Sequence, residues 1–407
     1  MKITQTSTRC WPYPAGLENF LLSISTELAQ LGDEITLLTT NSSGELSIPQ
    51  LRIGKLPLKN KQSPYPAQTV RLGPNIKIKR QKALLRIGPF HVTSNILYPD
   101  INQTDLIHVH SLTDFPNWIP IMLKLKHVPF VITIHDVTPT VANKFESTLW
   151  QPFNKYLMLR LLKRFHAVVV PSHVQLNFLK NLGFNPGKSV LIPLCFDNNV
   201  YKIKQKKPNN KIREQYNIQS DEFLIISIGR LIPTKRFDLL FLALKTVSKK
   251  FNSLKIKCLI IGPDEGYLKN LKIYSHSLGL SHIVHFTKEK NHLETLTILK
   301  SANLFIMPSD SEAFNISTIE AMALSVPVIV SSGVGASYLI KHYENGAVFK
   351  KSEPEELVKV LTNLLEKPDL LNNISLEGNK TAEKQCSPKS VAKKHHQLYR
   401  NVIQNAC

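Results

Sequence analysis

The sequence contains few cysteines and no long apolar run. Only five cysteines occur in 407 residues, widely spaced, and no two form a C-x-x-C pair. This pattern argues against a disulfide framework and against a zinc site, and it suits a reducing compartment. No stretch reaches the roughly 18 apolar residues that a membrane-spanning helix needs, and residues 1–14 lack the apolar core of a signal peptide. We therefore expect a cytoplasmic protein that does not span a membrane.

Acidic residues are also scarce. The sequence has 30 Asp and Glu against 51 Lys and Arg, which gives a formal net charge of +21. This excess favours an anionic partner, namely nucleic acid, a membrane surface or a phosphorylated small molecule, although lysine-rich composition drift would produce the same total. Few aromatic residues lie within the basic segments, and no nucleic-acid motif is recognisable. We therefore do not expect nucleic-acid binding.

The positive charge is concentrated in one segment. Residues 51–99 contain ten Lys and Arg and no Asp or Glu. Apolar residues are interleaved with these cations, as in VRLGPNIKIKRQKALLRIGPF, and such a mixture is typical of an element that lies on anionic lipid. We predict that residues 51–99 contact an anionic membrane surface from the cytoplasmic side. An exposed basic loop without a partner is the alternative.

Short apolar segments alternate with amphipathic segments along the chain. In the first half we predict strands at 34–40, 105–111, 129–136, 167–172 and 189–194 and helices at 18–32 and 174–184. In the second half we predict strands at 222–229, 256–262, 283–286, 303–308 and 327–332 and helices at 237–250, 265–279, 292–302, 317–325 and 353–368. Strands that alternate with such helices form parallel sheets covered on both faces, which is an α/β fold.

The two series of elements predict two doubly wound, Rossmann-like domains. We place the first domain at 1–192, a linker at 193–220 and the second domain at 221–387. The middle of the linker, 201–213, is polar and basic, which suits an exposed connection. Ligands of open parallel sheets bind beyond the carboxyl ends of the strands, so we expect the functional residues at strand ends.

Two glutamates lie at such a strand end. Glu312 and Glu320 occur in DSEAFNISTIEAMALSVPVIV with seven residues between them, and Ser317 or Thr318 would cap the helix that carries Glu320. Backbone N–H groups at a helix N-terminus bind an anion, and carboxylates accept hydrogen bonds from sugar hydroxyls. The arrangement suits a ligand with phosphates and hydroxyls, although two acids at this spacing also occur by chance.

This segment resembles the E-x7-E signature of the retaining family 4 glycosyltransferases, whose GT-B fold consists of two Rossmann-like domains that face a cleft. The family pattern is an acid, G-F-G, then E-A-M-A, a glycine and P-V-V; here Ala313, Asn315 and Ser325 replace the glycines. Asparagine is one of the few residues that tolerate a positive φ. The resemblance implies that Glu312 contacts the donor sugar and Glu320 the nucleotide ribose. It implies further donor contacts from Phe314, Asn315 and Ile316.

A second match follows the predicted strand at 222–229. SIGRLIPTKRFDLLFLAL resembles the family's G-R-L-x-x-x-K-G-x-D-x-L-L-x-A, with Arg236 in place of the last glycine. The match implies that Gly229, Arg230 and Lys235 bind the donor diphosphate. A guanidinium and an ammonium at a strand–helix junction neutralise a pyrophosphate and stabilise it as it leaves. Outside this pattern, an Arg and a Lys at this spacing would be an ordinary solvated pair.

The first half of the chain continues the resemblance. PYPAGLENFLL resembles the family's P-x-x-G-G-x-E, with Gly16 at the glycine where backbone approaches the donor phosphate and Ala15 at the other. His135 stands at the place of a family histidine that faces the donor sugar, and a structural histidine is the alternative. We expect His108 and His110 to be structural or to line the cleft.

The resemblance covers nearly the whole chain. It implies sugar transfer with retained configuration from a UDP- or GDP-linked donor, and it joins a last helix at about 388–407 to the first domain. No D-x-D motif stands at a strand end, so we expect no metal and no other cofactor, with the departing phosphate as the base. Because GT-B acceptors meet the first domain, the basic segment predicts a lipid or lipid-linked glycan acceptor.

Other functions stay open. A GT-B binding module that retains the nucleotide sugar but has lost turnover would explain the replaced glycines at 15, 313, 315 and 325. Against this reading, Glu312, Glu320, Arg230 and Lys235 are all present. A GT-B epimerase or phosphorylase is also compatible with the pattern. The sequence leaves the nucleotide base, the sugar, the acceptor and the oligomeric state open.

Overall fold

The structure is a computed structural model. It describes residues 1–7, 16–40, 69–81, 83–87, 90–93, 103–110, 122, 125, 127–135, 159–206 and 210–406, with the backbone alone over 83–87, 90–93 and 210–211. The chain divides into two compact units. The N-terminal unit comprises 1–171, 176–192 and 392–407, and the C-terminal unit comprises 172–175 and 193–391.

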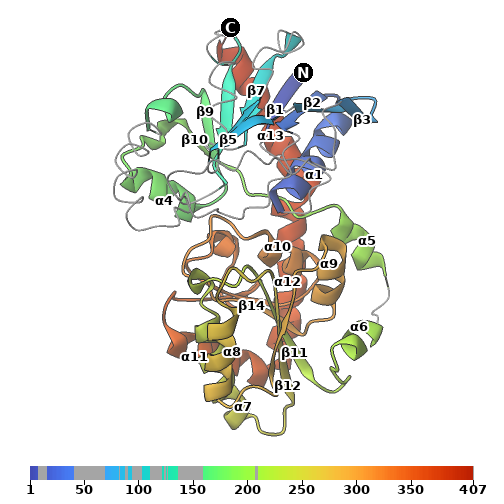
Figure 1. The fold of residues 1–407 in the computed structure, drawn as a ribbon, viewed down its shortest axis with the longest axis vertical. Helices are drawn as coiled ribbons and strands as arrows, with labels where there is room; N and C mark the ends of the chain where they lie inside the picture. The colour runs from blue at the N-terminus through green and yellow to red at the C-terminus, as the bar shows by residue number, and fades with distance from the viewer. Residues whose placement is uncertain are drawn as a thin grey trace. The chain divides into compact units, whose positions relative to one another are not determined.

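The N-terminal unit is built on a mostly parallel sheet (Figure 1). The described strands follow in the order β10 (Ser189–Leu191), β9 (Ala167–Val170), β8 (Phe130–Thr133), β7 (Leu106–Val109), β1 (Lys2–Thr6), β2 (Glu34–Thr40), β4 (Ile76–Gln81) and β3 (Thr69–Gly73). Only the edge strand β3 runs antiparallel to its described neighbour. β5 (Ala83–Ile87) and β6 (Phe90–Thr93) form a separate antiparallel pair. Helix α1 (Gly16–Gln30) connects β1 to β2 and buries Phe20, Ile24 and Leu28, which share one face at a spacing of four residues.

The C-terminal unit has a fully parallel sheet over its described strands. Their order is β13 (Val284–Thr287), β12 (Ile256–Ile261), β11 (Phe223–Ile228), β14 (Leu304–Met307), β15 (Val328–Ser331) and β16 (Ala347–Phe349). The intervening helices are α7 (Phe237–Lys250), α8 (Leu268–Ser277), α9 (His292–Lys300), α10 (Ile316–Ala323) and α11 (Pro354–Glu366). The chain builds outward from β11 to β13 and then returns to place β14 on the other side of β11. The direction of winding therefore reverses between β11 and β14, and such switch points are where open α/β sheets bind ligands.

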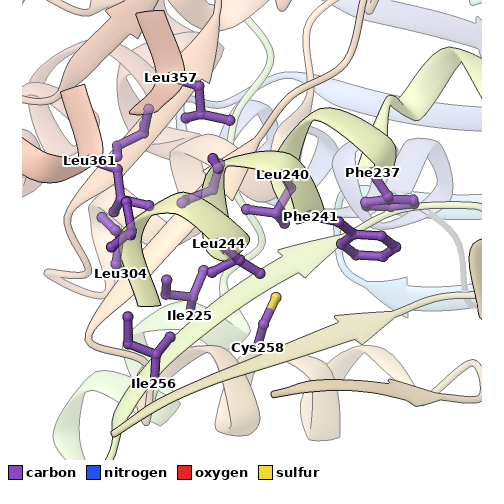
Figure 2. Close-up of a cluster of buried hydrophobic side chains, with 14 of the residues drawn as sticks. Ile225, Phe237, Leu240, Phe241, Leu244, Ile256, Cys258, Leu304, Leu357 and Leu361 are labelled. Carbon is purple, nitrogen blue, oxygen red and sulfur yellow. The ribbon is translucent and has the colours of Figure 1, made fainter. Parts of the chain in front are cut away.

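The core of the C-terminal unit lies between α7, α11 and the sheet. Figure 2 shows Leu240 and Leu244 of α7 above Ile225 of β11, with Leu361 of α11 beside them. These side chains are essentially inaccessible to solvent. Truncation of such a leucine to alanine costs about 2–5 kcal/mol, so this packing fixes the sheet whose strand ends carry the candidate site.

The basic segment contains the strands β3 to β6, none of which was predicted from the sequence. Strand β4 pairs in parallel with β2, and the side chains of Lys79 and Arg80 are only 7% and 5% exposed. These two cations are inaccessible to a lipid surface, so the prediction of one continuous surface element over 51–99 was wrong at β4. Arg71 on β3 is exposed and Lys77 is half-buried. Residues 51–68 lie outside the described residues.

Some helices in the described part of the chain were missed as well. Within the predicted linker lie α5 (Asn199–Gln205), which buries Val200 and Ile203, and α6 (Asn210–Gln215). Helix α12 (Pro368–Cys386) contains three Asn and one Gly, which are weak helix formers, and buries a narrow stripe at every fourth residue. The predicted last helix is present as α13 (Pro388–Ala406). Over the described residues, each helix is too short or too polar to cross a bilayer.

Candidate active site

The candidate site lies at the switch point of the C-terminal sheet. Strand β11 leads into Gly229, Arg230 and η4 (Pro233–Lys235), and the neighbouring β14 leads into the loop that carries Glu312. The backbone N–H of Asp310 donates to the Thr234 carbonyl over 3.0 Å, which ties the two strand-end loops together. Two segments 77 residues apart in sequence therefore place their polar side chains at one edge of one sheet.

Lys235 and Glu312 form an ion pair across this edge. The Lys235 ammonium donates to the Glu312 carboxylate, and the Ser309 hydroxyl donates to the same oxygen over 2.9 Å. Their side chains are 12% and 17% exposed, so each is mostly desolvated yet reachable by a ligand. A Cβ on Gly229 would lie 3.0 Å from Lys235 Cε. The glycine therefore leaves the space in which the lysine side chain lies.

The backbone around Glu312 is held by the loop after β15. The Glu312 N–H donates to the Gly333 carbonyl over 3.0 Å, and the Gly335 N–H donates to the Glu312 carbonyl over 3.1 Å. A Cβ on Gly333 would overlap the Asp310 carbonyl, and a Cβ on Gly335 would overlap that of Ala313. The two glycines of SSGVG thus permit the close approach that fixes the position of Glu312.

Asn315, rather than Ser317 or Thr318, caps the helix that carries Glu320. Its side-chain oxygen accepts from the Thr318 N–H over 2.9 Å and from the Thr318 hydroxyl over 2.8 Å. Asn315 has φ of 80°, which agrees with its expected tolerance for positive φ. The predicted cap was wrong because the helix begins one residue earlier, at Ile316.

Two of the other predicted donor contacts have different surroundings. The Phe314 side chain is 1% exposed, so it offers a ligand its backbone only. The half-exposed Arg230 pairs with Glu265 at 3.1 Å and, within the described residues, forms no hydrogen bond or ion pair with Lys235 or Glu312.

Glu320 is buried and bonded to a histidine that the sequence analysis did not single out. The Glu320 carboxylate is 2.8 Å from Nε2 of His292, whose Nδ1 is 3.6 Å from the Asp197 carboxylate. Burial lowers the pKa of His292, but the attraction of Glu320, its hydrogen bond and the charge of Asp197 outweigh burial and raise the pKa to about 8. Burial in turn raises the pKa of Asp197. No sequence signal marked His292, which appeared only as the first residue of a helix.

The predicted residues of the first half lie in the N-terminal unit. Gly16 is the exposed first residue of α1, and Ala15 lies outside the described residues. His135 is mostly buried, with Nε2 3.2 Å from Nδ1 of His110, and burial lowers the pKa of His135 to about 3. His108 is fully buried between the Tyr399 hydroxyl at 2.6 Å and the Thr133 hydroxyl at 2.7 Å, which suits the structural role expected of it.

Comparison with known families assigns both halves of the chain. The family model described as Glycosyltransferase Family 4 matches residues 14–199, and the model described as Glycosyl transferases group 1 matches residues 208–381. The chain is a glycosyltransferase, and the match to the first model is consistent with family 4. Its two Rossmann-like parallel sheets are the GT-B fold, as the sequence predicted.

Curated relatives of this glycosyltransferase match at modest identity. An uncharacterized glycosyltransferase of Haemophilus influenzae is 28% identical over 44% of this chain and 49% of its own length. An alpha-monoglucosyldiacylglycerol synthase of Streptococcus pneumoniae is 27% identical over 74% of this chain and 67% of its own. The chain thus spans about half of the Haemophilus relative.

Solved structures share the fold of this glycosyltransferase. Sucrose-phosphate synthase from Thermosynechococcus elongatus has a TM-score of 0.75, with 19% identity over 99% of both chains. HepE from Anabaena in complex with UDP-glucose has a TM-score of 0.69, with 18% identity over 98% of this chain and 100% of that one.

Three of the residues that replace family glycines in this glycosyltransferase occupy left-handed backbone, whereas Ala313 does not. Arg236 has φ of 51° and Ser325 has φ of 58°, in addition to Asn315. The Arg236 guanidinium pairs with Asp238 at 3.1 Å and with Asp310 at 2.9 Å, and its pKa is raised chiefly by the hydrogen bond to Asp238. These ion pairs offset the strain of a non-glycine residue and join the loop of Lys235 to that of Glu312.

Proposed function

We propose that the chain transfers a sugar from a UDP- or GDP-linked donor to an acceptor with retention of the anomeric configuration. One observation carries the proposal: Lys235 and Glu312 meet, mostly desolvated, at the switch point between β11 and β14. A cation for a diphosphate and a carboxylate for sugar hydroxyls are the groups that a nucleotide sugar requires. The resemblance to HepE, solved with UDP-glucose, supports a nucleotide-sugar donor.

Each residue then has a separate task. Glu312 accepts hydrogen bonds from the donor sugar, Glu320 binds the ribose, and Lys235 and Arg230 bind the diphosphate. Both cations pair with acids in the structure, Lys235 with Glu312 and Arg230 with Glu265, so the diphosphate replaces a carboxylate as their partner. The resemblance also assigns Gly16 and His135 to the donor; burial keeps His135 uncharged, so its proposed part is that of a neutral hydrogen-bonding group.

The chemistry requires charge stabilisation more than a side-chain nucleophile. As the glycosidic bond breaks, negative charge develops on the departing phosphate, and Lys235, Arg230 and the N-terminus of α10 stabilise it. The departing phosphate accepts the acceptor's proton. The enzyme requires no metal on this proposal, because these cations perform the metal's task.

The proposed acceptor is a lipid or lipid-linked glycan. The relative named alpha-monoglucosyldiacylglycerol synthase supports a lipid acceptor. The basic segment at 51–99 also supports one, through cations other than the buried Lys79 and Arg80. Flotation with vesicles of anionic lipid at low salt tests the membrane contact, and failure to float excludes it.

Nucleotide release from UDP-, GDP- and ADP-sugars, with and without membrane lipid, tests the activity. We expect release from one donor, raised by lipid and reduced 100-fold or more in Lys235→Met, since loss of one such contact costs about 10²–10³ in rate. Lys341→Met is the matched control, because the Lys341 side chain is 75% exposed and pairs with the similarly exposed surface residue Glu344. NMR of the product reports whether the anomeric configuration is retained. Nucleotide binding without release in every reaction would instead indicate a binding module.

A further inference from the structure

His292 lies between two carboxylates that come from separate elements. Its Nε2 is 2.8 Å from Glu320 on α10, and its Nδ1 is 3.6 Å from Asp197, which precedes α5. The Glu320 and Asp197 side chains are 4% and 9% exposed, and that of His292 is 21% exposed. Nδ1 of His292 is itself buried and has no hydrogen-bond partner among the described residues, because Asp197 lies slightly beyond bonding distance.

The start of α9 fixes the place of this histidine. Asn291 caps the helix and accepts from the Glu294 N–H over 2.9 Å, while the Glu294 side chain returns a bond to the Asn291 N–H. This capping box places His292 at the first helical position. Asp197 is fixed in turn by the Asn199 N–H, which donates to its other oxygen over 2.6 Å.

The charges around His292 favour its protonated form near neutral pH. The groups that face it are Glu320 and Asp197, and Lys202 of α5 lies near enough to Asp197 to lower the pKa of that acid. A protonated imidazole gives Glu320 a charge-assisted hydrogen bond, which is about twice as strong as a neutral one. The bond occupies Oε1 of Glu320 and leaves Oε2 for a ligand.

We propose that His292 is a positioning residue, which holds the Glu320 carboxylate in the orientation that binds the two ribose hydroxyls of the donor, and that Asp197 keeps His292 protonated. This inference rests on the role proposed above for Glu320. A long glutamate side chain has three rotatable bonds, and a fixed hydrogen bond removes the entropy that ordering it at binding would otherwise cost. Deprotonation of His292 weakens that bond and thus weakens ribose binding.

The test compares affinity for the nucleoside diphosphate of the preferred donor with affinity for its 2′,3′-dideoxy form, from pH 6 to pH 9.5. For the unmodified protein we expect the affinity for the ribose form, but not for the dideoxy form, to fall about 5-fold above pH 8. This factor corresponds to the difference in strength between a charged and a neutral hydrogen bond. His292→Gln keeps an N–H donor without a titrating charge, so its affinity should not change with pH over this range. His282→Gln, at an exposed histidine of the same unit, should behave as the unmodified protein.

Two further variants separate the possible failures. Glu320→Gln should abolish the preference for the ribose form; if it does not, the role of Glu320 itself is wrong. A different outcome overturns only the inference about His292: Glu320→Gln abolishes the preference for the ribose form, but the affinity of His292→Gln still falls above pH 8 as in the unmodified protein. Asp197→Asn keeps an acceptor for the Asn199 N–H, and it should move the fall in affinity for the ribose form to lower pH. This variant tests the inference even if His292→Gln does not fold. An unmoved alkaline loss would contradict the role of Asp197.

Discussion

Ser325 provides a direct measure of what a replaced family glycine costs. The residue follows α10 with φ of 58°, and its side chain is exposed. In the described part of the chain the Ser325 hydroxyl has no recorded hydrogen bond, whereas its backbone N–H donates to the Met322 carbonyl over 3.0 Å. Ser325→Gly therefore removes the strain of a Cβ in left-handed backbone without removing a contact.

The expected gain follows from two opposing contributions. Left-handed backbone costs a non-glycine residue about 1–2 kcal/mol. Against this, glycine lowers the free energy of unfolding by about 0.4–1 kcal/mol, because it gives the unfolded chain greater conformational freedom. The net stabilisation should be about 0.5–1 kcal/mol, or about 1–4 °C in Tm for a unit of this size.

The measurement is urea unfolding followed by circular dichroism and by tryptophan fluorescence. All three tryptophans, Trp11, Trp118 and Trp150, lie outside the described residues and outside the C-terminal unit in sequence, so fluorescence does not follow that unit. The added stability of Ser325→Gly should therefore appear in the unfolding curve followed by circular dichroism and not in the curve followed by fluorescence. Ser325→Ala is the control, because it keeps the Cβ and should not gain stability. A glycine variant no more stable than the alanine variant would refute the reasoning.

Four other perturbations have expected outcomes. Gly335→Ala should destabilise the C-terminal unit by about 2 kcal/mol or more and lower activity, because its Cβ would overlap the Ala313 carbonyl; unchanged urea unfolding would contradict this. Asn315→Ala removes the cap of α10 and retains positive φ, so circular dichroism should show a loss of about 1–2 kcal/mol. Burial lowers the pKa of His395 to about 3, so the N-terminal unit should lose up to about 1.4 kcal/mol per pH unit for this histidine as the pH falls below 6.5, measured by fluorescence. The raised pKa of His292 gives the opposite pH dependence. Its contribution to stability is complete below pH 6.5, and about 2 kcal/mol of stability is lost as the pH rises through 8, measured by circular dichroism.

The sequence predicted the α/β architecture because alternating apolar strands and amphipathic helices are a local signal. It also placed Glu312 and Lys235 at strand ends, and parallel sheets bring such ends to one edge. His292 could not be found in this way, because its contacts with Glu320 and Asp197 join segments distant in sequence. A partner that is close only in three dimensions leaves no periodic pattern.

Two other misses have different physical causes. Strand β4 is basic in sequence, yet pairing with β2 buries Lys79 and Arg80, so a pattern typical of a surface was overridden by tertiary structure. Helix α12 was missed because its buried stripe is narrow; Gly378 on that stripe lets the backbone of Asn345 approach, since a Cβ there would lie 2.9 Å from the Asn345 carbonyl oxygen. Weak helix formers and a glycine argue locally against a helix that packing stabilises.

The central claim is that Glu312 contacts the donor sugar while Lys235 binds the diphosphate. Titration of the preferred nucleotide sugar and of its free nucleoside diphosphate into Glu312→Gln and Lys235→Met tests both roles at once. We predict that Lys235→Met weakens both ligands. Glu312→Gln should weaken the nucleotide sugar alone and leave the free nucleotide bound equally or more tightly, because Lys235 is released from its ion pair. Equal weakening of both ligands by Glu312→Gln, or of neither, would contradict the assignment.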